Sequence, residues 1–220
     1  MKHFFTLILF FLSALGTAQT AQEILNKNIE LTGGRQNWKS LNSILLQGRA
    51  ILGLKEEYPV KIYQQRPNLT KTIITLQGKD VAIEGYDGKK GYAMNYAANK
   101  MQEYPGYKAE SFDSDFLDWK LKGYEIKYLG KEKLGNKICH KIELSKNRER
   151  AVYYFDAATH LLVQEQKGDE TLRYSDFRKV KSYTMPFRIE SESEKNESNY
   201  VLIINKIEIN KEFPANTFKF

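Results

Sequence analysis

The fold is decided by residues 58–96, which read YPVKIYQQRPNLTKTIITLQGKDVAIEGYDGKKGYAMNY. Apolar and polar side chains alternate in short runs along this stretch, and turn residues separate the runs. The tightest turn signal is Asp87-Gly88, and Arg66-Pro67-Asn68 ends an earlier run. Alternation interrupted by Gly, Pro, Asn and Asp is typical of an antiparallel meander with one face in water. We therefore predict four successive antiparallel strands.

The same rhythm continues on both sides of this stretch. Residues 43–54 form an unusually apolar strand, and turn signals such as Gly135-Asn136 and Met185-Pro186 divide the second half. The expected strands of the second half are Tyr124–Leu129, Lys137–Leu144, Ala151–Phe155, Leu161–Gln166, Thr171–Val180, Phe187–Glu192 and Tyr200–Ile209. Their spacing is near the ~8–12 residues found in β-sandwiches and barrels. Residues 212–220 are expected to add a turn and a short aromatic closing strand.

A helix is expected near the beginning of the mature chain. Ile24, Leu25 and Ile29, with Leu31 close by, have helical spacing. Thr20 can cap the helix, with Glu23 three residues later. Gly33-Gly34 then ends the helix, as glycine does after a last turn. This amphipathic helix needs an apolar surface to lie on, which the sheet can provide.

Residues 99–123 interrupt the strand rhythm. Phe112, Phe116 and Trp119 fall at i, i+4 and i+7, which predicts a short aromatic helix over residues 110–119 inside a long loop. Long inserts in compact domains are usually lids or binding loops. Three acids in this segment lack the glycine and the distal Glu of a calcium loop, so they are expected to serve capping and solubility: Asp113, Asp115 and Asp118.

The N-terminus has the features of a secretory signal peptide. Met1-Lys2-His3 is a positive head, an apolar run extends from Phe4 to Leu15, and Gly16-Thr17-Ala18 offers a cleavage site. The run is shorter than the ~20 residues that a membrane-spanning helix needs. We therefore expect residues 1–18 to be removed and residues 19–220 to form a single, exported, soluble domain in the periplasm. No Cys follows the run to accept a lipid.

Composition and charge exclude several classes of protein. The formal charge of +7 comes from 34 Lys and Arg scattered among 27 acids, which favours a solvated surface over a nucleic-acid interface. Cys139 is the single cysteine, so no intramolecular disulfide can form, and it is expected to be a small strand side chain. His140 is expected in the core and His160 in an exposed turn. Neither lies in a zinc or catalytic motif, so no metal, cofactor or catalytic residue is predicted.

The sequence holds more aromatic residues than a simple sheet needs, with 14 Tyr and 12 Phe. One long sheet must cover its apolar face, by closing on itself or by pairing with a lid. A half-closed barrel with an apolar cavity meets this requirement, and such a cavity suits an acyl chain or another lipid. A well-packed sandwich with no cavity meets it equally well. The composition leaves both arrangements open.

Three motifs, in their order and spacing, resemble the LolA-like family, the periplasmic carriers of outer-membrane lipoproteins. Arg66-Pro67-Asn68-Leu69 closes a strand, and Asp87-Gly88-Lys89 precedes a Tyr-rich strand that ends at Asn95-Tyr96. Residues 213–220 supply a late aromatic element, without the leading Asp of the family. The resemblance covers residues 24–96, and beyond them only the strand rhythm is similar.

The resemblance implies a mainly β fold, with a single antiparallel sheet curved into an open half barrel of roughly 11–12 strands, a short helical lid and an N-terminal helix. It implies that Arg66 points into the cavity and hydrogen-bonds the lid, which keeps the empty form closed. The implied partners are acylated lipoproteins or lipids, an inner-membrane ABC release complex and an outer-membrane acceptor. Nucleic acid is not a partner, and we expect a monomer.

Strand parity predicts which apolar residues face the cavity together with Arg66. They alternate with charged residues of the wet face, such as Lys61 and Glu190, although Ile74 competes with Ile73 for the inward position. The predicted cavity residues are Val60, Ile62, Ile73, Val81, Ile83, Tyr92, Met94, Ile142, Phe187 and Ile189. The expected function is a non-enzymatic carrier of acyl chains towards the outer membrane. A lipid-sensing protein on the same scaffold and an enzyme that uses His140 or a buried acid are the alternatives.

Overall fold

The computed structural model describes residues 20–53, 56–107, 109, 111–193 and 199–220. The predicted signal peptide lies outside these residues. A helix over residues 20–32 comes first, and α2 (Arg35–Ser40) follows after Gly33-Gly34. Gly34 has a φ of 86°, which glycine adopts without steric cost, and its N–H donates to the carbonyl of Ile29 at 2.9 Å. The predicted end of the first helix at the glycine pair is confirmed.

Thirteen strands make up most of the described chain. They are β1 (Ser43–Leu52), β2 (Glu56–Gln65), β3 (Leu69–Leu76), β4 (Lys79–Tyr86), β5 (Gly91–Asn95), β6 (Lys100–Glu103), β7 (Glu125–Leu134), β8 (Lys137–Lys146), β9 (Glu149–Asp156), β10 (Leu162–Lys167), β11 (Glu170–Val180), β12 (Tyr183–Ser193) and β13 (Tyr200–Ile209).

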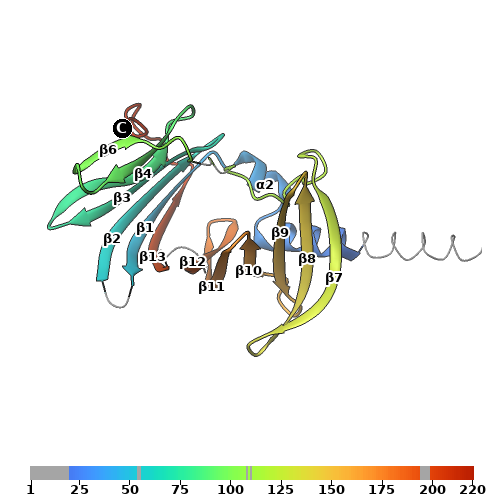
Figure 1. Ribbon diagram of the computed structural model, residues 1–220. Helices are drawn as coiled ribbons and strands as arrows, with labels where there is room; N and C mark the ends of the chain where they lie inside the picture. Colours follow the sequence, from blue (N-terminus) through green and yellow to red (C-terminus); the bar gives the residue numbers. More distant parts are fainter. Residues whose placement is uncertain (1–19, 54–55, 108, 110, 194–198) are drawn as a thin grey trace, which may run out of the picture.

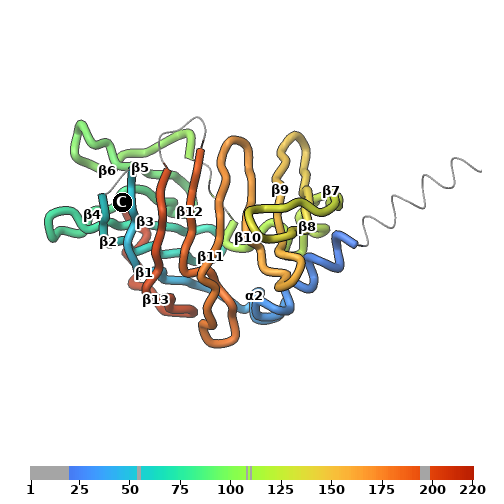
Figure 2. The backbone as a smooth tube through the Cα atoms, turned by 90° about the horizontal axis from the view of Figure 1, so that it is seen from below, coloured from blue at the N-terminus to red at the C-terminus, as the bar shows by residue number. Residues whose placement is uncertain are grey.

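All these strands belong to one sheet, in the order β6-β5-β4-β3-β2-β1-β13-β12-β11-β10-β9-β8-β7. β1 pairs antiparallel with β13, so the first and last strands of the chain meet in the middle of the sheet. β6 and β7 are the two edges, and the sheet is not closed on itself. The two ends of the sheet lie on either side of α2 (Figure 1), and β11 to β13 lie between them (Figure 2).

One face of the sheet carries the main apolar clusters. Directly opposed residues on neighbouring strands point to the same face. Following these pairs from β3 to β8 places one set of apolar side chains on a common face, which we call the inner face: Ile74, Val60, Leu202, Ile189 and Ile142. The helix over residues 20–32 packs on the β8–β9 part of this face, where Leu25, Ile142 and Phe155 are fully buried.

The connection from β6 to β7 crosses one end of the sheet. The N–H of Tyr104 donates to the carbonyl of Gly91 at 2.8 Å, and the N–H of Phe112 donates to the carbonyl of Pro67 at 3.1 Å. We call residues 111–123 of this connection the lid segment. Its residues Phe116 and Leu117 pack into the core beneath the first helix.

The predicted helix over residues 110–119 is wrong, and β6 forms inside what was expected to be loop. The lid segment is instead a series of turns, in which the N–H of Leu117 donates to the carbonyl of Ser114 at 3.0 Å. Asp118 has a φ of 55°, a left-handed conformation that a continuous right-handed helix cannot contain. The aromatic spacing therefore reflects packing of successive turns and not one helix face.

The predicted closing strand at the C-terminus is also wrong. Residues 211–220 form turns that pack on the outer face of β2 to β5. Phe213 meets Tyr63 with ring centroids 5.3 Å apart, and Phe220 stacks on Tyr92 at 4.6 Å. The Nζ of Lys71 donates to the carbonyl of Lys219 at 2.6 Å. This C-terminal segment covers aromatic rings that would otherwise lie in water.

The expected fold class is confirmed. The described chain is mainly β, with one antiparallel sheet that stays open, a first helix and a lid segment. In the described residues the sheet has thirteen strands, against the roughly 11–12 expected, and β6 is the strand that was not predicted.

Candidate functional site

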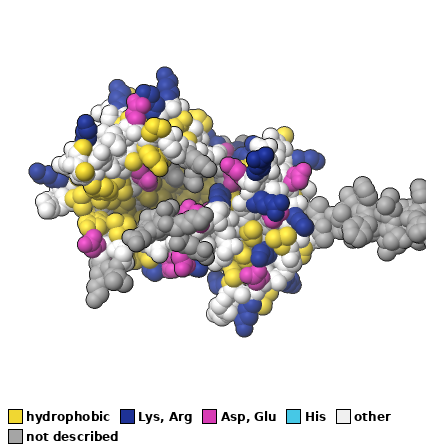
Figure 3. Space-filling view, viewed as in Figure 1, with side chains coloured by type: hydrophobic (Ala, Val, Ile, Leu, Met, Phe, Trp, Pro, Cys, Tyr) yellow, Lys and Arg dark blue, Asp and Glu magenta, His cyan; other side chains and the backbone are white. Residues whose placement is uncertain are grey.

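The inner face of β1 to β4, β12 and β13 forms an apolar trough. Its buried residues are Val60, Ile74, Phe187, Leu202 and Ile204. Half-buried apolar side chains pack around them, namely Leu46, Ala50, Tyr58, Ile62, Leu76, Ile83, Val180, Ile189, Tyr200 and Ile207. Figure 3 shows a hollow with hydrophobic side chains exposed in it over this half of the molecule. Exposed contiguous apolar surface of this kind marks a binding surface more often than chance.

The structure brings six of the predicted cavity residues to the trough. Five are members of its apolar cluster: Val60, Ile62, Ile83, Phe187 and Ile189. Val81 opposes Ile74 and therefore shares the inner face. Ile142 also points to the inner face, but the first helix covers it. The sequence did not single out the trough residues of β1 and β13, although both strands were predicted.

Three predicted cavity residues lie on the outer face instead: Ile73, Tyr92 and Met94. Ile73 opposes Lys61, and Tyr92 opposes Gly85 beneath the C-terminal segment. Ile73 points outward because β2 and β3 pair with Val60 opposite Ile74. For Tyr92 and Met94 the cause is a β-bulge between β3 and β4, where the register shifts between Thr72 and Ile73. A bulge adds one residue to one strand, so side-chain parity changes beyond it.

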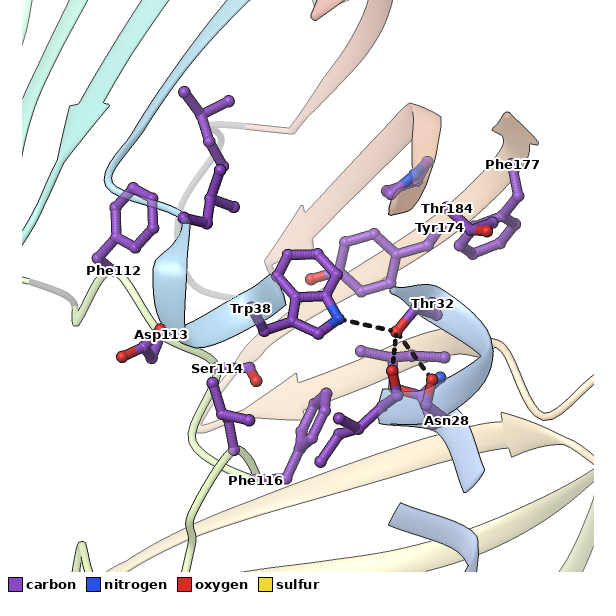
Figure 4. Close-up of a pocket in the computed structure, with 16 residues that line it drawn as sticks. Asn28, Thr32, Trp38, Phe112, Asp113, Ser114, Phe116, Tyr174, Phe177 and Thr184 are labelled. Carbon is purple, nitrogen blue, oxygen red and sulfur yellow. Dashed lines mark hydrogen bonds between the residues drawn. The ribbon is translucent and has the colours of Figure 1, made fainter. Parts of the chain in front are cut away.

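A cavity of about 350 Å³ lies next to the trough, between the first helix, α2, the lid segment and the sheet (Figure 4). It is lined by Asn28, Ile29, Thr32, Trp38, Leu41, Ile44, Phe112, Asp113, Ser114, Phe116, Leu117, Leu162, Tyr174, Phe177, Thr184 and Pro186. Its volume falls at the lower end of the ~300–1,000 Å³ of small-molecule sites. The sequence did not predict these lining residues.

Polar groups in the cavity wall bond mainly to the protein itself. The Nε1 of Trp38 donates to the Oγ1 of Thr32 at 3.2 Å, and that hydroxyl donates to the carbonyl of Asn28 at 2.8 Å (Figure 4). The Nδ2 of Asn28 donates to the carbonyl of His160 at 2.7 Å. Because these groups are already paired, this part of the wall favours an apolar ligand over one that needs hydrogen bonds.

The trough and the cavity are connected by side chains that pack against the walls of both. Val180 and Ile207 pack against the trough cluster and also against a second cluster around Leu41, Tyr183, Met185 and Ile209. Leu41 of this second cluster lines the cavity, as does Trp38, which packs against it. An extended apolar molecule could therefore occupy both spaces along one surface.

Arg66 connects the sheet, α2 and the lid segment. Its Nε donates to the carbonyl of Leu41 at 2.7 Å, and its Nη2 donates to the carbonyl of Trp38 at 2.9 Å, so it satisfies carbonyls at the end of α2. Nη1 and Nη2 bind the two oxygens of Asp113 at 2.5 and 2.7 Å. The guanidinium also lies 5.0 Å from the ring of Phe112. Asp113 and Phe112 are thus the partners of Arg66 in the lid segment, which could not be named from the sequence.

The other two acids of the lid segment bind different elements. Asp118 pairs with Arg35 and with the Nζ of Lys39, which is 2.7 Å away, and the Lys39 hydrogen bond is the main reason that its pKa is lowered. Asp115 accepts from the hydroxyl of Tyr153 at 3.0 Å and pairs with Lys167 at 3.0 Å.

Burial raises the pKa of Asp115, but Lys167 and the Tyr153 hydroxyl outweigh it, so the pKa lies below its usual value. These acids hold the lid segment closed over the core. They are thus more than caps and solubilising groups, and among the described residues no cluster of His, Cys, Asp and Glu is suited to a metal.

The histidines and the cysteine lie away from the cavity lining. Cys139 was expected to be a small side chain on a strand. It lies on β8 and is fully buried on the outer face of the sheet. His140 is half-buried, bonds the hydroxyl of Tyr128 at 3.0 Å and stacks on His160 at 6.2 Å. His160 was expected to be exposed, but it is partly buried. Burial is the main reason that the pKa of both imidazoles is lowered.

Comparison with known proteins identifies the fold. No family model and no curated protein matches the sequence. A LolA superfamily protein from Nitrosomonas europaea superposes with a TM-score of 0.58 at 14% identity, covering 93% of this chain and 98% of that one. A putative outer membrane lipoprotein-sorting protein domain from Vibrio parahaemolyticus gives 0.60 at 12% identity, covering 92% and 97%.

The chain therefore has a LolA-like fold, as its motifs indicated. The sequence identity is too low for the likeness to show more than the fold. Within the described residues, none of the helices combines the length and the apolar character that crossing a membrane requires.

Proposed function

We propose that this protein is a periplasmic carrier that holds the acyl chains of lipoproteins, or related lipids, and moves them towards the outer membrane. The observation that carries the proposal is the apolar trough of the inner face, whose residues share packing partners with the cluster beside the cavity under the lid segment. Each methylene group of an acyl chain that leaves water stabilises the complex by about 0.8 kcal/mol. The half-buried side chains of the trough are also removed from water by this contact, which stabilises the complex further.

The lid segment supplies a means of opening and closing. In the closed form, Asp113 and the end of α2 share the guanidinium of Arg66. Phe112 and Phe116 of the lid segment line the cavity, so a ligand inside it contacts the lid segment directly. We propose that a bulky ligand displaces these side chains and thereby favours an open form. A ligand shifts such an equilibrium only by binding one form more tightly. We therefore propose that the trough residues bind the ligand and that Arg66, in the wall of the same site, controls access to it.

The proposed role is non-enzymatic and exported. His140 and His160 are not among the residues that line the cavity, and the polar groups Asn28 and Thr32 of its wall are engaged within the protein. The apolar segment at residues 1–18 supports export as a signal peptide. By analogy with the fold, an inner-membrane ABC complex would load the carrier and an outer-membrane acceptor would unload it, with the carrier acting as a monomer.

The test combines lipid identification with a binding assay. Mass spectrometry of material that copurifies with the periplasmic protein identifies the cargo. A fluorescent fatty-acid probe then gives affinities for the wild type, Arg66→Leu and a control, Arg49→Leu. Arg49 pairs with Glu57 at 3.2 Å, and both side chains are about half exposed, away from the lid. We expect Arg66→Leu to raise the apparent affinity, because the closed empty form no longer competes.

Each outcome decides a part of the proposal. If acylated lipoprotein copurifies, and Arg66→Leu retains a different amount of it, the carrier function is supported. If only free lipid copurifies, the protein binds lipid but does not carry lipoproteins. A protein that copurifies with nothing and does not bind the probe contradicts the proposal as a whole.

A further inference from the structure

A cation stands at the junction of the two parts of the apolar inner face. Arg178 on β11 directly opposes Met185, which belongs to the cluster beneath α2. Its guanidinium lies 4.6 Å from the ring of Phe187, which is a buried member of the trough cluster. An arginine stacked on an aromatic face keeps its charge and its hydrogen-bonding edges available. A ligand lying along the trough towards the cavity passes this residue.

The guanidinium has an open edge for an anion. The Nε and Nη2 of Arg178 donate to the two carboxylate oxygens of Asp176 at 2.9 and 2.5 Å. Within the part of the chain that the structure describes, no hydrogen bond is found for its Nη1. The pair is open to water, with 54% of the Arg178 side chain and 44% of the Asp176 side chain exposed. Exposed pairs of this kind contribute little to stability, so an incoming anion can share or replace Asp176.

Arg66 differs from Arg178 in its hydrogen-bond partners and in its exposure. Arg66 uses all three of its nitrogens in bonds to the protein and is 26% exposed. It is therefore occupied in the closed form, whereas Arg178 is accessible. Asp176 has a φ of 53° within β11, a conformation that is rare for residues other than glycine and is often found at functional sites.

We propose that Arg178 binds the anionic headgroup of an amphipathic ligand whose acyl chain lies on the apolar inner face. A carboxylate or a phosphate fits the planar fork of a guanidinium through two parallel hydrogen bonds. The ligand class is thus a single- or multiple-chain lipid with a carboxylate or phosphate near the first methylene groups. This proposal rests on the proposed function and concerns its related anionic lipids, because the acyl chains of a lipoprotein are joined through uncharged ester and amide groups.

The experiment compares three ligands with chains of one length: palmitate, a palmitoyl lysophosphatidic acid and the neutral monopalmitoylglycerol. Their affinities are measured for the full-length protein by displacement of a fluorescent probe, in the wild type and in Arg178→Gln. The matched control is Arg188→Gln. Arg188 pairs with Glu190 two residues along β12 at 2.7 Å and is 39% exposed, and it opposes Ile203 on the outer face.

We expect Arg178→Gln to weaken an anionic ligand about tenfold, the loss of one charge-assisted contact, while the neutral ligand is unaffected. Arg188→Gln should change none of the three affinities. If only palmitate or only the phosphate ligand is weakened, the proposal holds and the natural headgroup is identified. Equal affinities in wild type and Arg178→Gln, or an equal loss for the neutral ligand, would overturn it.

Asp176→Asn provides an independent variant, since Asn tolerates the left-handed backbone and removes the competing charge. It should tighten both anionic ligands and leave the neutral one unchanged, and unchanged anionic affinities would count against the site. If the neutral ligand binds the wild type and Arg178→Gln has no effect, the headgroup site fails while the carrier function stands. If none of the ligands binds the wild type, both proposals fail.

Discussion

At the scale of single residues, Arg66 links three parts of the molecule that are distant in sequence. It contacts the carbonyls of Trp38 and Leu41 and the carboxylate of Asp113 while following directly on β2. Its inward direction could be predicted, because its parity matches Val60 and Ile62. Its partners could not be predicted, since the lid segment has no alignable motif and its turns are set by tertiary packing.

The Arg66–Asp113 pair should show measurable coupling in a double-mutant cycle. Urea unfolding of Arg66→Leu, Asp113→Asn and the double variant is expected to give a coupling free energy of about 1–3 kcal/mol, because the bonds are bidentate and three-quarters buried. The exposed pair Lys61–Asp80 serves as a control and should couple by about 0–1 kcal/mol. Equal couplings for the two pairs would show that Arg66 is not a latch.

The two stacked histidines make stability depend on pH. Burial lowers the pKa of His140 and His160 in the folded protein, while an unfolded His titrates near ~6.5. The folded state thus binds protons less readily than the unfolded state, so stability is complete above ~6.5 and falls as the pH decreases towards the folded pKa. Above this window, the two groups contribute no pH dependence.

His160→Asn should therefore reduce the loss of unfolding free energy between about pH 7 and about pH 5. Asn suits this position because His160 has a φ of 57°. Chemical denaturation at several pH values provides the measurement. The same decrease in wild type and variant would show that His160 has no part in it.

At the scale of elements, the C-terminal segment seals the outer face of β2 to β5. Gly85 leaves space for it, because a Cβ there would lie 2.2 Å from the Cζ of Phe220. Phe220 also lies 4.6 Å from the Nζ of Lys71. The aromatic residues at the chain end were visible in the sequence, but they were predicted to form a strand. The bulge between β3 and β4 places Tyr92 on the face that Phe220 covers.

Phe220→Ala should destabilise the protein by about 1–2 kcal/mol, through loss of the stacking on Tyr92 and of the cation–π contact with Lys71. Tyr96→Ala is the control, since Tyr96 is 72% exposed and should change stability by no more than about 0.5 kcal/mol. Thermal or urea unfolding compares the two variants. Similar small effects of both would mean that the C-terminal segment is not anchored as described.

The strands of the sheet could be predicted well, and their faces less well. Turn residues and alternation identified the strands from β7 to β13, because these signals are local. Met185-Pro186 was wrongly predicted as a turn, since both residues lie inside β12, which begins at Tyr183. The bulge at Ile83 of β4 reversed the parity of Tyr92 and Met94, and its position depends on pairing between strands. The cavity was missed for the same reason, since helix, lid segment and four strands meet there only in the folded chain.

At the scale of the whole molecule, the open sheet has two unpaired edges that need protection. β7 is the longer edge, and it carries exposed lysines and a register shift between Tyr128 and Gly130. Lysines and bulges at an edge oppose pairing with another chain. Part of the positive charge of the chain therefore protects the β7 edge from pairing with another chain.

Replacing Lys127, Lys131 and Lys133 together by Val should therefore cause concentration-dependent association, detected by sedimentation velocity and light scattering. The same positions changed to Arg keep the charge and should leave the wild-type behaviour. A soluble, monodisperse Val variant would show that the lysines do not protect this edge.

The central claim is that an acyl chain lies on the apolar inner face of the sheet. A photoreactive palmitate carrying a diazirine near the end of its chain tests it most directly, with the cross-linked residues located by mass spectrometry. We predict cross-links to trough and cavity residues such as Val60, Ile189 and Phe116. Cross-links confined to the outer face around Tyr63 and Tyr92, or none at all, would contradict the claim.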